Sequence, residues 1–323
     1  MTRKTWIDNL RGFCMLAILL DHTELYYAEK NIIDYNLYVV NALVIFFFLS
    51  GYLMYKETTF DIKHKLCAIC KTLLLPYLIF TTLISIPKIM VHGGHIIPQK
   101  IALDIVTGQA SWFVAALCIS ELIFALTLWI SKGKNTAILA CGGCGFAVSI
   151  YLSTRNQPYF WQLDNALQAL LFMSLGYLYH KYETVFNHIN KTSYISLFLL
   201  LIIGIKIYEY HLHVDMLIWN IHISNYPLFL LDISIYTLAI TQIFKRMPSS
   251  KWLSWTGKHS IVYYFLCGGV PLIVSKLLTK SGLPYNGNYL LVILAFMLVY
   301  LIATIITFLI YQYVPFIVGK KYE

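Results

Sequence analysis

The sequence has few charged residues for its length. Only 12% of its 323 residues are charged and 59% are hydrophobic, whereas about a quarter of the residues in an ordinary soluble domain are charged. A chain of this composition cannot cover a large surface with water-binding groups, which excludes the two soluble domains that its length would allow. The first apolar stretch contains Arg11, Asp21 and His22 and lacks a small-residue cleavage pattern, so we expect no cleaved signal peptide.

Metal-binding patterns are missing as well. The seven cysteines lie mostly in apolar segments, and neither Cys67 with Cys70 nor Cys141 with Cys144 is accompanied by a second cysteine pair. We therefore expect buried structural thiols and no bound metal. Because no internal repeat, low-complexity tract or appended soluble domain is visible, we expect one transmembrane domain over residues 1–323.

Long apolar segments follow one another along the whole chain. About 20 such residues cross the hydrocarbon core as a helix, because backbone groups in lipid must be hydrogen-bonded within the segment. The sequence therefore predicts an all-α, polytopic transmembrane helical bundle of about ten spans, with four prolines, at 76, 87, 227 and 271, marking kinks or helix ends. The ten expected spans are 6–27, 37–55, 66–91, 109–131, 135–153, 159–180, 193–211, 226–246, 258–279 and 287–312.

The basic residues indicate how the chain is oriented. Ten spans place both termini on one side, and a cytoplasmic N-terminus puts 16 of the 24 lysines and arginines at the inner face and 7 at the outer face. The formal charge of +9 thus follows the inner membrane surface and forms no patch suited to nucleic acid. We expect a multi-pass protein of the cytoplasmic membrane, in contact with membrane lipids, and the sequence is compatible with a monomer or a homo-oligomer.

Two ionisable residues of the first span point to function, because charged groups are costly within a membrane. Arg11 and His22 are eleven residues apart, which is three helical turns plus about 20°, so they share one helix face about 16 Å apart. Either residue alone could be structural, by reaching the headgroups or by joining helices. Together they indicate one cavity, in which a histidine in the outer third can accept a hydroxyl proton near neutral pH.

The residue that orients the His22 ring has to come from another helix. Asp21 and Glu24 point about 100° and 200° away from His22 around the first helix. We expect Asp164 in this role and, as second choice, Glu121 near the membrane centre. Polar residues of later spans lie about 6–9 Å deep, as His22 does, and could either line one outward-facing pocket or only bond helices together. They are Asn41, Asp164 and Asp232.

A set of motifs resembles the acyltransferase-3 family of membrane acyltransferases. Asn9-Leu10-Arg11-Gly12-Phe13, with His22 eleven residues after the arginine, is similar to the start of that family. Further similar motifs follow in the family's order over nearly the whole chain. They are Phe47-Phe48-Leu49-Ser50-Gly51-Tyr52-Leu53, the basic segment from Lys63 to Lys71 with Pro76-Tyr77, Ser111-Trp112-Phe113, Leu175-Gly176-Tyr177-Leu178, and Gly257-Lys258-His259-Ser260-Ile261 to Tyr264.

The resemblance implies transfer of an acyl group, most often acetyl, from acyl-coenzyme A in the cytoplasm to a hydroxyl of a surface glycan, lipopolysaccharide or related glycolipid. His22 would be the general base, and Arg11 would neutralise the donor. We expect Lys258 to lie beside a helix N-terminus that Gly257 opens, where it could bind a phosphate of the donor. The residues expected to make further contacts to the donor are Ser50, Lys63, Lys65, Lys71, Lys258 and Ser260. We expect contacts to the acceptor or the thioester from Asn41, Trp112 and Asp232.

The chain departs from the family's pattern in two places. Many members carry a histidine where this chain has Cys267, which argues against a catalytic role for that position. The basic segment also has lysines where arginines are common, so bidentate binding of phosphate is weaker.

Two other classes of protein fit parts of the sequence. A transporter or flippase for a small molecule or lipid-linked sugar also has buried charges, but paired repeats with broken helices, typical of transporters, are not visible. A purely structural subunit would leave Arg11 and His22 without a purpose.

Overall fold

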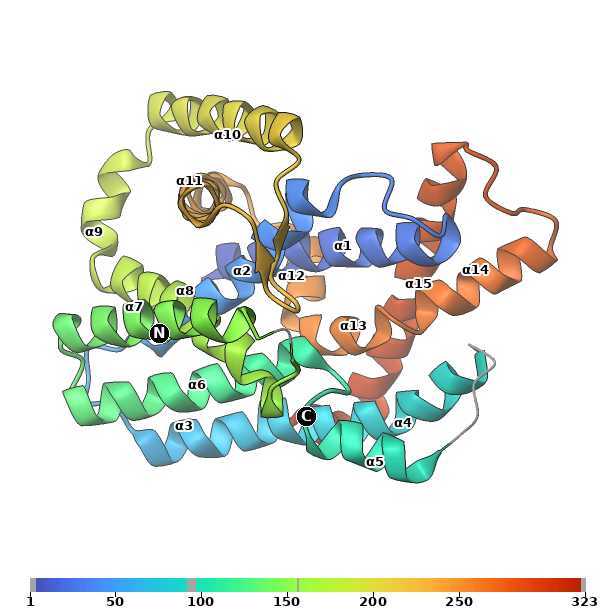
Figure 1. Cartoon of the computed structure of the whole chain (residues 1–323), viewed down its shortest axis with the longest axis horizontal. Coiled ribbons are helices and arrows are strands. Elements are labelled where there is room, and N and C mark those ends of the chain that lie inside the picture. The colour runs from blue at the N-terminus through green and yellow to red at the C-terminus, as the bar shows by residue number, and fades with distance from the viewer. Residues whose placement is uncertain (1–3, 92–96, 156, 321–323) are drawn as a thin grey trace. The chain divides into compact units, whose positions relative to one another are not determined.

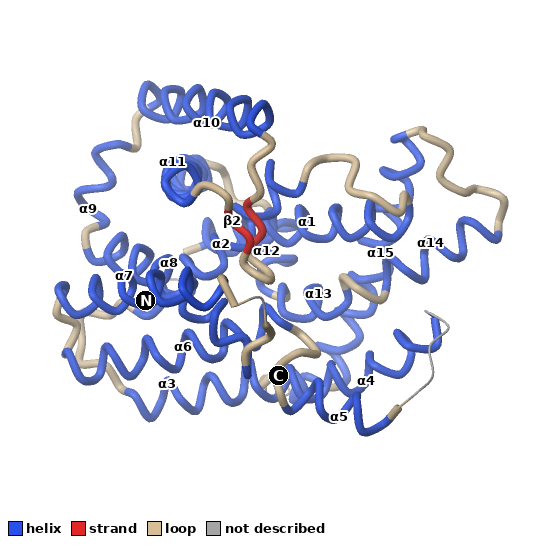
Figure 2. Tube along the Cα trace, viewed as in Figure 1, coloured by secondary structure: helices blue, strands red, loops and turns tan. Residues whose placement is uncertain are grey.

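The computed structural model describes residues 4–91, 97–155 and 157–320, which form helices and one short hairpin (Figures 1 and 2). The α-helices are α1 (Thr5–Tyr27), α2 (Tyr35–Met54), α3 (Ile62–Ile69), α4 (Leu75–Val91), α5 (Pro98–Val106), α6 (Trp112–Ser131), α7 (Asn135–Ser153), α8 (Leu163–Lys181), α9 (Glu183–Phe186), α10 (Thr192–Leu212), α11 (Tyr226–Arg246), α12 (Lys251–Lys258), α13 (Ser260–Leu266), α14 (Val270–Lys280) and α15 (Tyr289–Tyr313). A π-helical turn, η1 (Cys70–Leu74), joins α3 to α4, and the 3₁₀ turns are η2 (Phe160–Gln162), η3 (Asn187–Ile189) and η4 (Pro315–Val318). The antiparallel strands β1 (Met216–Leu217) and β2 (His222–Ile223), red in Figure 2, are the one departure from an all-α fold in the described ranges.

Each of the ten predicted spans contains a helix. Among the described residues, seven helices are long and apolar enough to cross a membrane, or eight if α13 and α14, bent by 49°, form one span. α1 and α8 have 23 and 19 residues but are more polar than those helices. The chain is therefore a multi-pass helical protein, while the number of ten and the cytoplasmic termini stay predictions.

Two compact units share the chain, and each combines segments that are distant in sequence. Unit 1 comprises 1–42, 71–106 and 249–323, and unit 2 comprises 43–70 and 107–248. Each unit is described by itself below.

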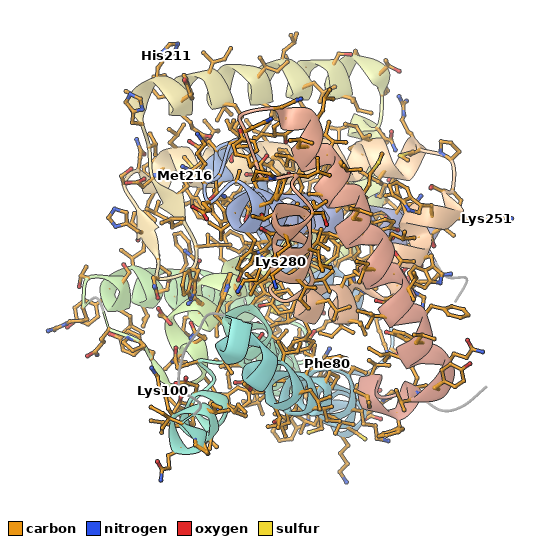
Figure 3. All side chains as sticks on the ribbon, turned by 90° about the vertical axis from the view of Figure 1, so that its right-hand side faces the viewer. Phe80, Lys100, His211, Met216, Lys251 and Lys280 are labelled. Carbon is orange, nitrogen blue, oxygen red and sulfur yellow. The ribbon has the colours of Figure 1, made fainter. Side chains whose placement is uncertain are left out.

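In unit 1, two glycines let the backbones of α1 and α12 approach closely. A β-carbon added to Gly12 would collide with the carbonyl oxygen of Leu253, and one added to Gly257 would collide with that of Asp8. Small residues allow such close helix approach in membranes. On α4, Phe80 (labelled in Figure 3) stacks on Phe265 of α13, with ring centroids 4.9 Å apart.

Unit 2 repeats this device between α2 and α8. A β-carbon on Gly51 would overlap the backbone of Met173, and one on Gly176 would overlap the carbonyl oxygen of Phe48. α7 packs along α8, where Gly142 leaves room for Ser174, and α6 lies along the same helix (Figure 1). Gly51 therefore permits close helix approach, and α8 is the helix that approaches it.

The four prolines lie in two kinds of position. Pro227 and Pro271 lie in the first turns of α11 and α14, where a missing N–H costs nothing. Pro76 lies inside α4, directly after the wider π turn η1, which accommodates a residue without an N–H. Pro87 also lies within α4. Two of the four expected kinks or ends are therefore helix starts.

Candidate active site

Arg11 and His22 lie on α1, which runs unbroken from Thr5 to Tyr27 in unit 1. The helix that the spacing argument requires is therefore present, and it places the two side chains on one face about 16 Å apart. Both residues are half-buried, and the Nδ1 atom of His22 is buried. The His22 ring stacks with the ring of Tyr26, one turn later, at 6.3 Å between centroids.

The two carboxylates beside His22 hold the loop that follows α1. Glu24 is fully buried, and one of its carboxylate oxygens accepts the backbone N–H groups of Ile32 and Ile33 at 2.8 and 2.9 Å. Its other oxygen accepts the hydroxyl of Tyr289 at 2.7 Å. Asp21 accepts a hydrogen bond from the side chain of Asn31. Both carboxylates thus have structural partners, as expected for groups that point away from His22.

The helix ends near Arg11 carry positive charge. The crossing of α1 with α12 at Gly12 and Gly257 places Arg11 and Lys258 at the same crossing. Lys258 is exposed and is the last residue of α12, so Gly257 ends a helix, and the prediction that it opens one is wrong. The first residue of the next helix, α13, is Ser260, which is half-buried.

The end of the chain joins this region of unit 1. The ring of His259 lies edge-on to Tyr311 of α15 at 4.2 Å, and the ammonium of Lys320 lies 4.8 Å from the centroid of the same tyrosine. A β-carbon on Gly319 would overlap the backbone of Lys71, so the π turn η1 between α3 and α4 also contacts the end of the described chain. Lys71 itself is exposed.

In unit 2, three predicted site residues from three helices form one network. Ser50 of α2 donates a hydrogen bond to one carboxylate oxygen of Glu121 on α6, and Lys65 of α3 lies 2.7 Å from the other. The side chains of Lys65 and Glu121 are 23% and 11% exposed. The lysine charge is therefore largely balanced by Glu121, whereas Lys63 on the same short helix is exposed.

Asp232 belongs to a buried ion cluster of unit 2. Lys206 of α10 reaches Asp232 of α11 at 2.8 Å and Glu209 at 3.0 Å, and the Asp232 side chain is fully buried. The Lys206–Asp232 ion pair joins α10 to α11, so the burial of Asp232 is explained without a bound ligand. Contact between Asp232 and an acceptor stays a prediction.

The other expected contacts are dispersed over the two units. Asn41 lies in the α2 portion of unit 1 and is buried, while Trp112 opens α6 in unit 2 with its ring edge-on to Phe113 at 5.6 Å. Cys267 is a buried thiol that donates to the carbonyl oxygen of Tyr264 at 2.8 Å.

The sequence reasoning missed a group of buried amides at the start of α8. Gln162, Asn165 and Gln168 are 5%, 3% and 3% exposed and accompany Asp164, which is 7% exposed. The signal was available, because these four residues fall within seven positions of a predicted span and lower its hydropathy. The sequence analysis singled out only Asp164 among them, because a charged group within a membrane span is the stronger signal and an amide carries no charge.

Comparison with known proteins gives one match. A family model described as an acyltransferase domain matches residues 4–312, which is nearly the whole chain. No curated protein and no solved structure matches the sequence.

Proposed function

The chain belongs to the acyltransferase-3 family of membrane acyltransferases, and from this premise we propose that it transfers an acetyl group from cytoplasmic acetyl-coenzyme A to a hydroxyl of a surface glycan, lipopolysaccharide or related glycolipid. One observation carries the proposal: Arg11 and His22 lie on one face of an unbroken, half-buried helix. We place the protein in the cytoplasmic membrane, because that membrane faces both the coenzyme A pool and the exported glycan.

In the proposed reaction His22 acts as the general base. Its imidazole accepts the proton of the acceptor hydroxyl while the hydroxyl oxygen attacks the thioester carbonyl carbon. The carbon–sulfur bond then breaks, the new ester remains on the sugar, and the leaving coenzyme A thiolate takes the proton back from the His22 imidazolium, which regenerates the base. No acyl-enzyme is required. Because Arg11 and His22 are about 16 Å apart along α1, an extended pantetheine arm could run from one to the other.

The donor's phosphates are proposed to lie at the end of unit 1 where α1 begins. Arg11, Lys258 and Lys71 are there, and Ser260 opens α13 beside them. Guanidinium and ammonium groups bind phosphate through charge-assisted hydrogen bonds. In unit 2, Ser50 and Lys65 are weaker candidates because both are already engaged by Glu121, whereas Lys63 is exposed.

Arg11→Ala is expected to weaken coenzyme A binding at least tenfold and leave folding nearly intact, because it removes a donor-facing charge from a half-buried site. Isothermal titration calorimetry of purified protein in nanodiscs measures the affinity. Arg11→Lys should recover part of it, since the charge remains but the bidentate fork is lost. Lys251→Ala is the matched control, because it removes an exposed charge at the start of α12 (Figure 3). Unchanged binding in Arg11→Ala would refute the assignment.

The carboxylate that orients His22 stays a prediction, and two variants separate the candidates. Glu121 is occupied by Ser50 and Lys65, whereas the Oδ1 atom of Asp164 is buried without a hydrogen-bond partner among the described residues. We therefore expect Asp164→Asn to slow transfer well over tenfold with donor binding retained, and Glu121→Gln to lower stability first, because Lys65 loses its counter-charge. A neutral Asp164→Asn would transfer the role to Glu121.

The decisive experiment for the function uses purified protein in nanodiscs with radiolabelled acetyl-coenzyme A and a panel of glycans and glycolipids. Label on a glycan that alkali releases as acetate identifies O-acetyl transfer. A transporter or flippase would instead move an unmodified substrate across the bilayer of proteoliposomes without using coenzyme A. Movement without acetylation would reject the proposal.

A further inference from the structure

A chain of side-chain amides connects two loops at one end of unit 2. Gln109, before α6, donates to the carbonyl oxygen of Tyr159 at 2.9 Å, and Gln162 donates to the amide oxygen of Gln109 at 2.7 Å. Asn165 in turn donates to the amide oxygen of Gln162 at 3.0 Å. The loop before α6 and the loop between α7 and α8 are thus held together by amides. Gln109 and Gln162 use both polar atoms of their amides in this chain, whereas the amide oxygen of Asn165 has no partner among the described residues.

Three buried polar atoms beside this chain have no hydrogen-bond partner among the described residues. They are Asn165 Oδ1, Gln168 Nε2 and Asp164 Oδ1, all on the first two turns of α8 and all in residues at most 7% exposed. Leaving such an atom unsatisfied is unfavourable, because burial removes its hydrogen bonds to water and nothing replaces them. Because Asp164 and Gln168 are four residues apart, and Asn165 and Gln168 three, the atoms belong to one face of the helix. One hydrogen-bond donor, the Gln168 amide nitrogen, and two acceptors, the Asn165 and Asp164 oxygens, therefore lie on the same face of α8 without partners among the described residues.

The backbone leading into α8 is strained where it presents this group. Trp161 and Gln162 have φ values of 50° and 53°, in the left-handed region where the β-carbon of a non-glycine residue is crowded by its own backbone. The N–H of Trp161 is held by the carbonyl oxygen of Thr107 at 2.8 Å, and Gly108 lacks the β-carbon that would lie 2.6 Å from Trp161 Cα. Strain of this kind persists where the surroundings enforce it, often at binding sites.

The positive charges of unit 2 identify the end at which these amides lie. Lys181 bonds Asn135, Lys245 pairs with Glu183, and Arg246 bonds Thr192, so the C-terminal ends of α8 and α11 meet the N-terminal ends of α7 and α10. Lys132, Lys134 and Lys191 lie at these same ends. The amides are at the opposite end of α8, which the positive-inside rule assigns to the outer face.

We propose that Gln162, Asn165 and Gln168, with Asp164, form a subsite for a neutral, hydroxyl-rich sugar unit of the acceptor. A sugar hydroxyl both donates and accepts, so adjacent hydroxyls satisfy the Gln168 amide and the Asn165 oxygen together, with Asp164 beside them. The carboxylate disfavours an anionic ligand, which separates this subsite from the lysine-rich opposite end. The placement of the sugar in the reaction rests on the proposed function, but its binding does not.

The test compares sugar binding with acetyl transfer in Gln168→Leu. Wild type and variant in nanodiscs are titrated with methyl α-glucoside, methyl β-galactoside and N,N′-diacetylchitobiose at millimolar concentration, and binding is followed by saturation-transfer NMR. We expect at least one of these sugars to bind wild type and to lose tenfold or more in affinity in the variant. The KM for the glycan acceptor should rise at least tenfold and the KM for acetyl-coenzyme A should stay within twofold. Gln168→Met replaces the leucine variant if the latter does not fold.

Gln242→Leu is the matched control. Gln242 is a fully buried glutamine at the lysine-rich end of unit 2, where its amide donates to the hydroxyl of Tyr179 at 2.8 Å. Its loss should lower thermal stability and leave sugar affinity unchanged, whereas Gln168→Leu should leave stability unchanged or raise it, because an unsatisfied buried amide is replaced by an apolar side chain.

The outcomes distinguish this inference from the proposed function. If sugars bind wild type but not Gln168→Leu while no acetyl group is transferred, the subsite stands and the acetyltransferase proposal fails. If transfer proceeds with an unchanged acceptor KM in Gln168→Leu, the amides hold ordered water only and the subsite is rejected. Wild type that binds none of the three sugars also rejects it.

Discussion

His22→Ala should lower the rate of acetyl transfer at least a hundredfold while coenzyme A binding stays within twofold of wild type. A positioned general base contributes about 10²–10⁴-fold to such a reaction, and the donor's phosphates are proposed to lie about 16 Å away at Arg11. Stopped-time assays with radiolabelled acetyl-coenzyme A measure the rate, and calorimetry measures the affinity. The pattern expected of a base is a loss of kcat with little change in the KM of either substrate.

His211→Ala provides the control for that experiment. His211 lies exposed near the end of α10 (Figure 3), so its loss removes an imidazole without touching α1. Transfer should be unchanged in this variant. Two results would count against His22 as base: transfer within a few-fold of wild type in His22→Ala, or an equal loss of transfer and coenzyme A binding, which would indicate a damaged fold.

The helices were predictable from sequence because the polar groups of a backbone segment in lipid find no water and have to bond to one another within the segment. A segment of about 20 apolar residues must satisfy its own hydrogen bonds, so apolar length alone locates the helices. The irregular features depend on packing instead. The π turn before Pro76, the 49° bend between α13 and α14, and the hairpin at 216–223 have no periodic signal in the sequence.

The site was predictable only where one helix defines it. Arg11 and His22 are related by the geometry of α1 alone, so their spacing was sufficient. Lys206 shows the opposite case, because the half-buried ammonium group forms ion pairs with both Asp232 and Glu209. Glu209 is three residues away on the same helix, but Asp232 lies on α11, and no spacing within one helix reveals that pair. The same holds for Glu121, whose partners come from α2 and α3.

Glycine replacement at the two close helix crossings should damage folding more than any other single methyl group added to the chain. In Gly12→Ala and Gly257→Ala the new β-carbon would collide with backbone carbonyl oxygens of α12 and α1, and in Gly51→Ala and Gly176→Ala with backbone atoms of α8 and α2. A side chain can turn away from a collision, but a helix backbone cannot, so the helices must separate. Overpacking of this kind costs about 1–3 kcal/mol, occasionally more. We expect the melting temperature of each single variant to drop by several degrees. The double variant that carries both Gly12→Ala and Gly257→Ala should no longer give monodisperse protein. Both results are measured by fluorescence-detected chromatography after heating.

Gly143→Ala and Gly204→Ala are controls of the same chemistry in α7 and α10. An added β-carbon at either position meets no atom within 4 Å, so the methyl group should leave the melting temperature unchanged or raise it slightly, since alanine favours a helix over glycine by about 1 kcal/mol. Equal losses in all six single variants would show that glycine is needed for helix flexibility and not for close approach. Unequal losses place the requirement at the crossings, and at Gly12 the crossing also sets the position of Arg11. Loss of coenzyme A binding in a Gly12→Ala protein that still folds would then follow from displacement of α1 against α12.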